Sequence, residues 1–229
     1  MIQRIAFLLI VLLGAPAAFA QCAERVLVSG YFSNNVHVYD GCNGAFERLL
    51  DDQNRIRGPQ AVKIGPDGRL YVVSEENGRI LRYDARTLAY IDTFITTGAG
   101  FNATGIAFGP DGDVYLGGYA SDTVRRYDGT TGAFEATVVA ARAAGLNGPD
   151  NGLTFGPDGR LYIPAYDSNS VAVYDPASGT TSAFIAPSSG GLSQTRGILF
   201  EANGNVLVSG EGSNAILRYG PGGNFIGTF

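Results

Sequence analysis

The sequence has few of the residue types that catalytic and nucleic-acid-binding proteins use. Its 229 residues include no tryptophan, one histidine, one methionine and two cysteines. The 16 basic residues are outnumbered by 21 acidic ones and form no cluster that could neutralise phosphates. This composition argues against binding to nucleic acid or to an anionic membrane surface, and the absence of tryptophan disfavours sugar binding.

The single histidine is a poor candidate for proton transfer. The residues at the place of His37 in the other repeats of the chain, described below, are Leu81, Arg125, Ala172 and Leu217. Because these are ordinary strand residues, we expect His37 to be structural. With no second histidine, a Ser-His-Asp triad cannot be assembled.

Residues 1–20 have the pattern of a secretory signal peptide. Arg4 is followed by an apolar run over 5–13 and by Ala18-Phe19-Ala20, a small-residue cleavage site. The apolar run is too short for a membrane span, and Gln21 stands where a lipidated cysteine would need a small residue before it. We therefore expect cleavage after Ala20. The mature chain, 21–229, is then one domain, periplasmic or secreted, with no membrane span.

One pattern occurs four times, at 60–84, 104–128, 151–175 and 196–220. The Gly-Pro-Asp-Gly turn of each copy, or its relic, begins at Gly65, Gly109, Gly156 and Glu201, in steps of 44, 47 and 45 residues. Short strands and glycine-rich turns with this period are typical of β-propeller blades, and one such unit cannot bury its apolar faces alone. The sequence therefore predicts an all-β propeller.

Each complete repeat predicts four strands, which in the second repeat are 60–65, 69–74, 79–84 and 90–95. The Asp-Gly pairs supply the positive φ angles of tight hairpins, and the Asp of each Tyr-Asp pair is expected to accept hydrogen bonds in the next turn. The first repeat begins directly with a second strand, 25–30. About 19 strands result, in four full blades and one of three strands. The ring could close with a short blade, stay open, or be an incomplete six-bladed ring.

The repeated phrase, such as Gly105-Ile106-Ala107-Phe108-Gly109-Pro110-Asp111-Gly112 followed by Arg126-Tyr127-Asp128, resembles the NHL-type repeat of bacterial propellers. The resemblance covers essentially all of 26–229. Propellers of this kind include scaffold-like proteins, gluconolactonase-like hydrolases, peptidyl-hydroxyglycine lyases and streptogramin lyases. The resemblance implies the fold and leaves the function to the residues of the site.

By this resemblance, the first residues of the innermost strands face the mouth of the central channel; they are Gln60, Thr104, Asn151 and Arg196. The gluconolactonase-like enzymes hold a divalent metal there, and Asn151 matches their Asn phrase. Gln60 and Thr104 are poor ligands for a hard cation, however, and Arg196 opposes one. The lyases require histidine chemistry that one structural histidine does not supply. We therefore expect no metal, no cofactor and no catalytic residue.

A second set of residues ends the second strand of each repeat, and propeller symmetry places it in a ring beside the same mouth: Tyr31, Glu75, Tyr119, Tyr166 and Glu211. Asparagines occupy the turns beside most of them. Tyrosine provides contact area at little cost in entropy, together with a hydroxyl group. Packing against loops is the alternative role. These residues predict an exported, non-catalytic propeller that binds a protein, peptide or polar small molecule at its channel mouth; the alternative is a gluconolactonase-like, metal-dependent hydrolase with a degenerate site.

The two cysteines predict one disulfide. Cys22 precedes the first strand and Cys42 lies in the turn after Tyr39-Asp40, and the blade arrangement puts both on the same rim of the propeller. A bridge there would fix an N-terminal segment that otherwise frays.

Unreduced, rapidly alkylated protein is therefore expected to contain no free thiol and to yield a peptide pair joined through Cys22 and Cys42. Peptide mass spectrometry before and after reduction measures this directly. Recovery of both cysteines in alkylated form would contradict the prediction.

Overall fold

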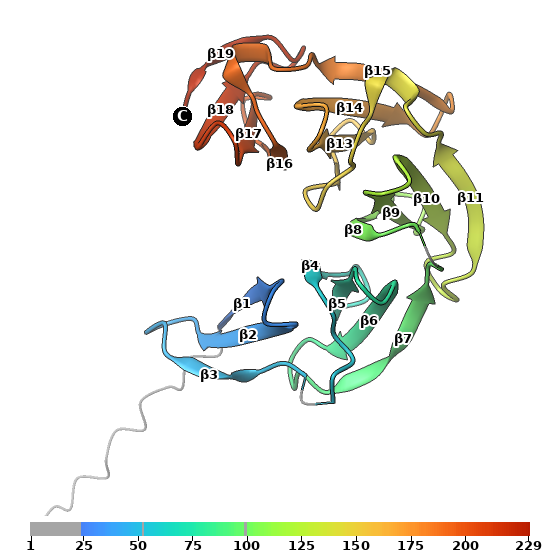
Figure 1. Ribbon diagram of the computed structural model, residues 1–229, viewed down its shortest axis with the longest axis vertical. Helices are drawn as coiled ribbons and strands as arrows, with labels where there is room; N and C mark the ends of the chain where they lie inside the picture. The colour runs from blue at the N-terminus through green and yellow to red at the C-terminus, as the bar shows by residue number, and fades with distance from the viewer. Residues whose placement is uncertain (1–23, 52, 99) are drawn as a thin grey trace, which may run out of the picture.

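In the computed structural model, the described part of the chain forms 19 strands in five antiparallel sheets, which follow one another as blades around an axis (Figure 1). The structure describes residues 24–51, 53–98 and 100–229, so the expected signal peptide and Cys22 lie outside the described residues. The first blade consists of β1 (Arg25–Gly30), β2 (Asn35–Asp40) and β3 (Phe46–Leu49). Within the described ranges, no helix is long and apolar enough to cross a membrane.

The other four blades have four strands each, and two short 3₁₀ helices lie in the connections between blades. Their bounds, in chain order, are β4 (Pro59–Ile64), β5 (Arg69–Ser74), β6 (Arg79–Asp84), β7 (Tyr90–Thr96), β8 (Ala103–Phe108), β9 (Val114–Gly118), β10 (Thr123–Tyr127), β11 (Phe134–Val139), η1 (Ala143–Gly145), β12 (Thr154–Phe155), β13 (Leu161–Ala165), β14 (Ser170–Asp175), β15 (Thr180–Ile185), η2 (Ser189–Gly191), β16 (Thr195–Phe200), β17 (Val206–Gly210), β18 (Ala215–Tyr219) and β19 (Phe225–Thr228).

The propeller and its strand order are confirmed. Strands pair with their sequence neighbours within each blade, as in the order β4-β5-β6-β7, and β5 and β6 have the predicted bounds. The first blade has three strands, as the sequence predicts. The five blades form an arc, and the first and last blades lie on either side of an opening (Figure 1).

The aspartates of the repeat are engaged in turn chemistry. In the second blade, Asp67 accepts hydrogen bonds from the backbone N–H of Arg69 (3.0 Å) and from the hydroxyl of Tyr71 (3.0 Å). The Asp of the Tyr-Asp pair, Asp84, accepts from the N–H groups of residues 86 and 87, and the Thr87 N–H and hydroxyl lower the pKa of its carboxyl. These bonds satisfy backbone donors that the strands leave unpaired.

In three of the five blades, a side chain in the turn between the second and third strands of the repeat bonds to the blade that follows. Three of these residues have φ near +50°, a conformation that Asn and Asp tolerate better than most residues, and their side-chain Oδ1 atoms accept a hydrogen bond from a backbone N–H just before the next blade. The pairs are Asn34 with Gly58 (2.8 Å), Asp122 with Gly148 (2.8 Å) and Asn169 with Gln194 (2.7 Å). These side chains therefore position the mouth and are not available to a ligand.

Each blade buries its apolar faces against its neighbours. Leu70 and Val72 of β5 are 1% and 0% exposed because they pack with Val36 and Val38 of the first blade in one core cluster. The corresponding residues of β1, Val26 and Val28, face the opening and are 51% and 46% exposed. The same repeat position is therefore core or surface according to whether a preceding blade covers it.

This difference predicts unequal costs for one substitution made at two equivalent positions. Val72→Ala should lower the free energy of unfolding by on the order of 2 kcal/mol, because it leaves a cavity between blades. Val28→Ala should cost less than about 0.5 kcal/mol, because water already reaches that side chain. Urea denaturation of the two variants and the wild type measures both costs; equal losses would show that β1 is covered in solution.

Candidate functional site

A cavity of about 250 Å³ lies at the mouth of the central channel. All five blades contribute to its lining, which consists of Tyr31, Gln60, Glu75, Thr104, Tyr119, Asp150, Tyr166 and Arg196. Seven of these are residues that the sequence places at the mouth. Glu211 and Asn151 are not among the lining residues. Glu211 does form hydrogen bonds with two of them, Arg196 and Tyr166.

Strand register explains why these residues converge. In three blades the first residue of the innermost strand lies opposite the end of the second strand: Pro59 with Ser74, Ala103 with Gly118, and Thr195 with Gly210. In the fourth blade Pro149, in an isolated bridge ahead of β12, lies opposite Ala165 in the same way. The side chains of the two residues that directly follow such a pair, one on each segment, then lie at the mouth. This rule selects Gln60 and Glu75 in the second blade.

In the fourth blade the rule selects Asp150, the residue before the predicted Asn151. Seven residue steps separate Pro149 from the turn glycine Gly156, whereas six separate Pro59 from Gly65. The extra residue shortens β12 to Thr154–Phe155 and moves Asp150 into the ring. Gly152 permits this detour, since a Cβ there would lie 2.2 Å from the carbonyl oxygen of Arg196.

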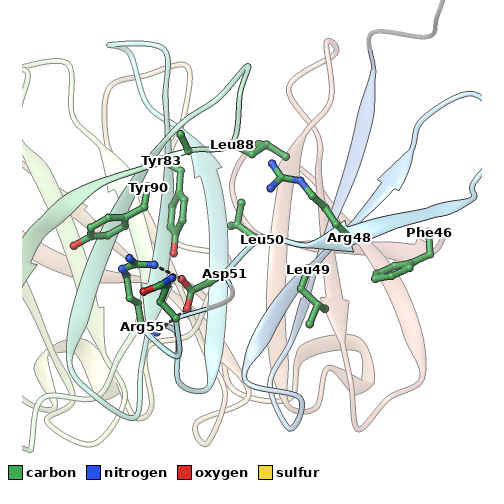
Figure 2. Close-up of a pocket in the computed structure, with 11 residues that line it drawn as sticks. Phe46, Arg48, Leu49, Leu50, Asp51, Arg55, Tyr83, Leu88 and Tyr90 are labelled. Atoms are coloured by element: carbon green, nitrogen blue, oxygen red, sulfur yellow. Dashed lines mark hydrogen bonds and ion pairs between the residues drawn. The ribbon is translucent and has the colours of Figure 1, made fainter.

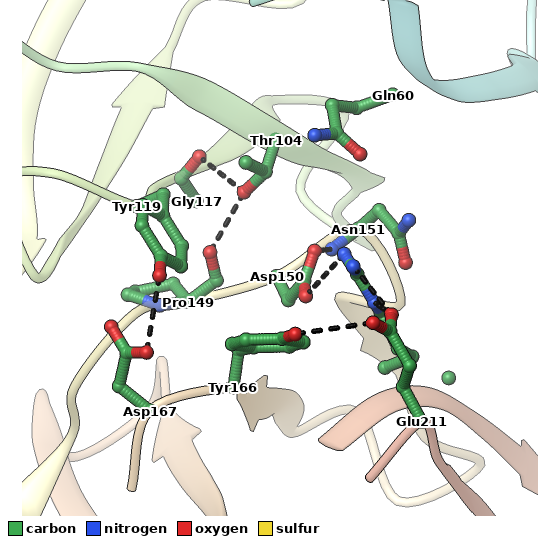
Figure 3. A network of polar contacts seen from close by, with 12 residues as sticks. Gln60, Thr104, Gly117, Tyr119, Pro149, Asp150, Asn151, Tyr166, Asp167 and Glu211 are labelled. Atoms are coloured by element: carbon green, nitrogen blue, oxygen red, sulfur yellow. Dashed lines mark hydrogen bonds and ion pairs between the residues drawn. The ribbon is translucent and has the colours of Figure 1, made fainter. Parts of the chain in front are cut away.

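Arg196 pairs with two carboxylates at once, those of Asp150 and Glu211, both of which Figure 3 labels. Its guanidinium lies 2.9 Å from Oδ2 of Asp150 and 2.6 Å from Oε2 of Glu211, and it stacks over the ring of Tyr166 at 4.5 Å. Asp150 is buried, and burial raises the pKa of its carboxyl although Arg196 opposes the shift. The pKa of Glu211 is lowered by its hydrogen bond with Arg196. The single guanidinium at this cavity is thus shared between two acids.

Glu75 is the third carboxylate of the mouth, and its partners are neutral. Gln60 Nε2 donates to its Oε2 at 2.7 Å, and Asn102 Nδ2 makes a longer contact of 3.5 Å with its Oε1. Burial raises the pKa of Glu75, and these amide donors and the more distant Arg196 oppose the shift. Among the described residues, none forms an ion pair with it, so its charge is the least compensated in the cavity.

The tyrosines that line the cavity keep their hydroxyl groups protonated at neutral pH. The rings of Tyr119 and Tyr166 lie edge to face with centroids 6.3 Å apart, and the hydroxyl of Tyr119 donates to Asp167 at 3.1 Å (Figure 3). Burial, followed by the bond to Asp167, raises the pKa of Tyr119 to about 12, and burial raises the pKa of Tyr31 as well. At neutral pH these side chains therefore offer aromatic surface and hydroxyl groups, and no phenolate base.

The residues of the mouth do not fit a divalent metal. Arg196 occupies the oxygens of Asp150 and Glu211 that face it, and the hydroxyl of Thr104 donates to the carbonyl of Pro149 at 2.7 Å. A hard cation needs several free anionic oxygens, and Glu75 alone remains. Elsewhere in the described part of the chain, the carboxylates of Asp113, Asp128 and Glu135 lie close enough together to resemble a metal site. Asp113 and Glu135 pair with the guanidinium of Arg126 instead.

A larger hollow, of about 690 Å³, lies on the outer rim between β3 and the second blade (Figure 2). Two blades form it. Arg55 pairs with Asp51 at 2.7 Å and stacks on Tyr90 at 4.3 Å, and Arg48 donates to the carbonyl of Thr87 at 3.0 Å. Apolar Phe46 and Leu49 are exposed at its edge. The mouth, where all five blades converge around an uncompensated carboxylate, is the stronger candidate for a binding site.

Comparisons with known proteins find similarity of structure without similarity of sequence. No family model and no curated protein matches the chain. It is similar to a catalytically inactive histidine-to-alanine variant of virginiamycin B lyase from Staphylococcus aureus, crystallised with quinupristin (17% identity, TM-score 0.69, 91% of this chain and 67% of that chain). It is also similar to a protein of unknown function from Bacteroides caccae (14%, 0.70, 92% and 79%) and to a gluconolactonase-like protein (17%, 0.69, 92% and 75%).

These identities speak to the fold alone. The chain spans 67%, 62% and 64% of the three streptogramin-lyase structures that it resembles. The sequence repeats resemble those of lyase and gluconolactonase-like propellers. The structural comparisons confirm this resemblance at the level of the propeller fold.

The raised pKa of Glu75 predicts how its removal changes stability with pH. A carboxyl whose pKa rises on folding, here from 4.5, stabilises the folded state while it is protonated, and that contribution is lost as pH rises through the folded value. The stability of Glu75→Gln relative to the wild type should therefore increase as pH rises from about 4 towards neutrality. Urea denaturation between pH 4 and 8 measures this difference. A pH-independent difference would show that the Glu75 carboxylate is solvated as in an unfolded chain.

Proposed function

We propose that this chain is an exported, non-catalytic propeller that binds a small polar ligand at its channel mouth. The observation that carries the proposal is the convergence of all five blades on one cavity, lined by three tyrosines and by a carboxylate with no cationic partner. Packing alone does not require such residues, because burial of Glu75 and Asp150 works against folding. Export is supported by the signal-peptide pattern of residues 1–20.

The positions of the titratable groups support a role in binding over one in catalysis. The single histidine, His37, lies on β2, with Nε2 2.9 Å from the hydroxyl of Ser33 and its ring stacked on Tyr39. It is not one of the residues that line the mouth. Arg196 neutralises Asp150 and Glu211, which a metal-dependent hydrolase would need as free ligands. This arrangement therefore does not support the hydrolase alternative better than it supports a binding role.

The test is a screen of small polar compounds by ¹⁹F NMR on protein labelled with fluorotyrosine. The chain has 12 tyrosines, so the mouth and the rim hollow each carry their own reporters. Compounds that bind at the mouth should shift the resonances of Tyr31, Tyr119 and Tyr166, assigned by Tyr→Phe variants. Hits that shift only Tyr83 and Tyr90 would place binding at the rim hollow and contradict the proposal.

The same proposal predicts that the mouth tyrosines matter more for binding than for stability. The double variant Tyr119→Ala/Tyr166→Ala should lose the screened hits while the free energy of unfolding falls by less than about 2 kcal/mol, because both rings are partly exposed. The matched control is Tyr115→Ala, at a fully buried position, which should cost about 3–5 kcal/mol. A loss in the double variant as large as in the control would assign the mouth tyrosines to packing.

A further inference from the structure

The charges of the channel mouth are not balanced. Three carboxylates, those of Glu75, Asp150 and Glu211, lie around a single guanidinium. Arg196 pairs with Asp150 and Glu211, and Glu211 also accepts from the hydroxyl of Tyr166 at 3.2 Å. No described residue completes the pairing of Glu75. A ligand that enters this cavity therefore meets one acid that lacks a cation.

The surroundings of Glu75 suit an organic cation better than an anion or a metal ion. Gln60 turns its Nε2 to the carboxylate, and its amide oxygen accepts no hydrogen bond from the described residues. An ammonium group could donate to that oxygen and to the carboxylate together. The faces of neutral tyrosine rings attract a cation and cover an alkyl stem, whereas a metal ion would need more anionic oxygens than Glu75 offers.

We propose that the ligand of this site carries a primary ammonium group on an alkyl stem, with the ammonium paired to Glu75 and the stem lying against the mouth tyrosines. The inference rests on the proposed function and specifies the class of its ligand. The cavity, at about 250 Å³, is of a size for a free diamine or for a single lysine side chain.

Isothermal titration calorimetry with two matched pairs of probes tests this chemistry. Cadaverine is compared with 1,5-pentanediol, and Nα-acetyl-lysine methylamide, whose side-chain ammonium is free, with the corresponding norleucine compound. The first pair differs in both terminal ammonium groups and the second pair in one. Both amines are expected to bind at least about tenfold more tightly than their neutral counterparts, because only the amines form a charge-assisted hydrogen bond with the Glu75 carboxylate. Tighter binding of cadaverine than of the lysine compound would indicate that the ligand is a free amine, and the reverse order would indicate a lysine side chain of a peptide.

Variants assign the effect to one carboxylate. Glu75→Gln should weaken amine binding about tenfold or more and leave the neutral probes unchanged. Glu135→Gln removes the same charge from the outermost strand of the third blade, away from the mouth, and should change amine affinity less than about threefold. Amine affinity of the wild type should also fall as pH is lowered through the raised pKa of Glu75, with Asp150, Glu76, Tyr31 and Arg196 as the other titratable groups that face it. In Glu75→Gln this pH dependence should largely disappear.

The outcomes separate this inference from the proposed function. Equal binding of amines and neutral probes, or amine binding that survives Glu75→Gln, overturns the ammonium assignment and leaves the mouth as a binding site. Calcium binding that displaces cadaverine and is lost in Glu75→Gln also overturns it, in favour of a metal. If no probe binds and the fluorotyrosine screen gives no hit at the mouth, the proposed function fails as well.

Discussion

Packing of one blade face against the next is the interaction on which the rest of this structure depends. A four-stranded blade is apolar on both faces, so its strands are near-continuous runs of apolar residues and each face needs a covering neighbour. Val36 and Val38 meet Leu70 and Val72 in this way, and other clusters join the later blades. The residues that pack between blades occupy equivalent positions in every repeat. The turns that connect the strands are therefore equivalent as well, and the five turns that follow the second strand of each repeat lie on one rim of the arc.

The mouth gathers acidic residues whose burial works against folding. Glu75 and Asp150 lose solvation there, and burial raises the pKa of both carboxyls. Arg196 compensates for Asp150, and the amides around Glu75 compensate in part without supplying a charge. Groups that oppose folding in this way are typical of binding sites, where a ligand supplies the missing interaction.

The repeat in the sequence was sufficient to predict the propeller, its 19 strands and the turn chemistry of its aspartates. It also placed Tyr31, Glu75, Tyr119 and Tyr166 together, because equivalent positions of a repeat lie on one ring. Counting back from the turn glycine selects Asn151, because it assumes a strand without irregularity, whereas one extra residue brings Asp150 to the lining of the mouth. The 47-residue step of that repeat was the available sign of the insertion. The ties made by Asn34 and Asn169 to the following blade could not be foreseen, because they depend on contacts between repeats.

The most direct measurement of the central claim is a crystal structure of the wild-type protein soaked with cadaverine. The account predicts electron density in the channel mouth with one terminal nitrogen within about 2.7–3.2 Å of the Glu75 carboxylate and the alkyl chain against the tyrosine rings. Density for the diamine confined to the rim hollow, with the mouth filled by water alone, would contradict it.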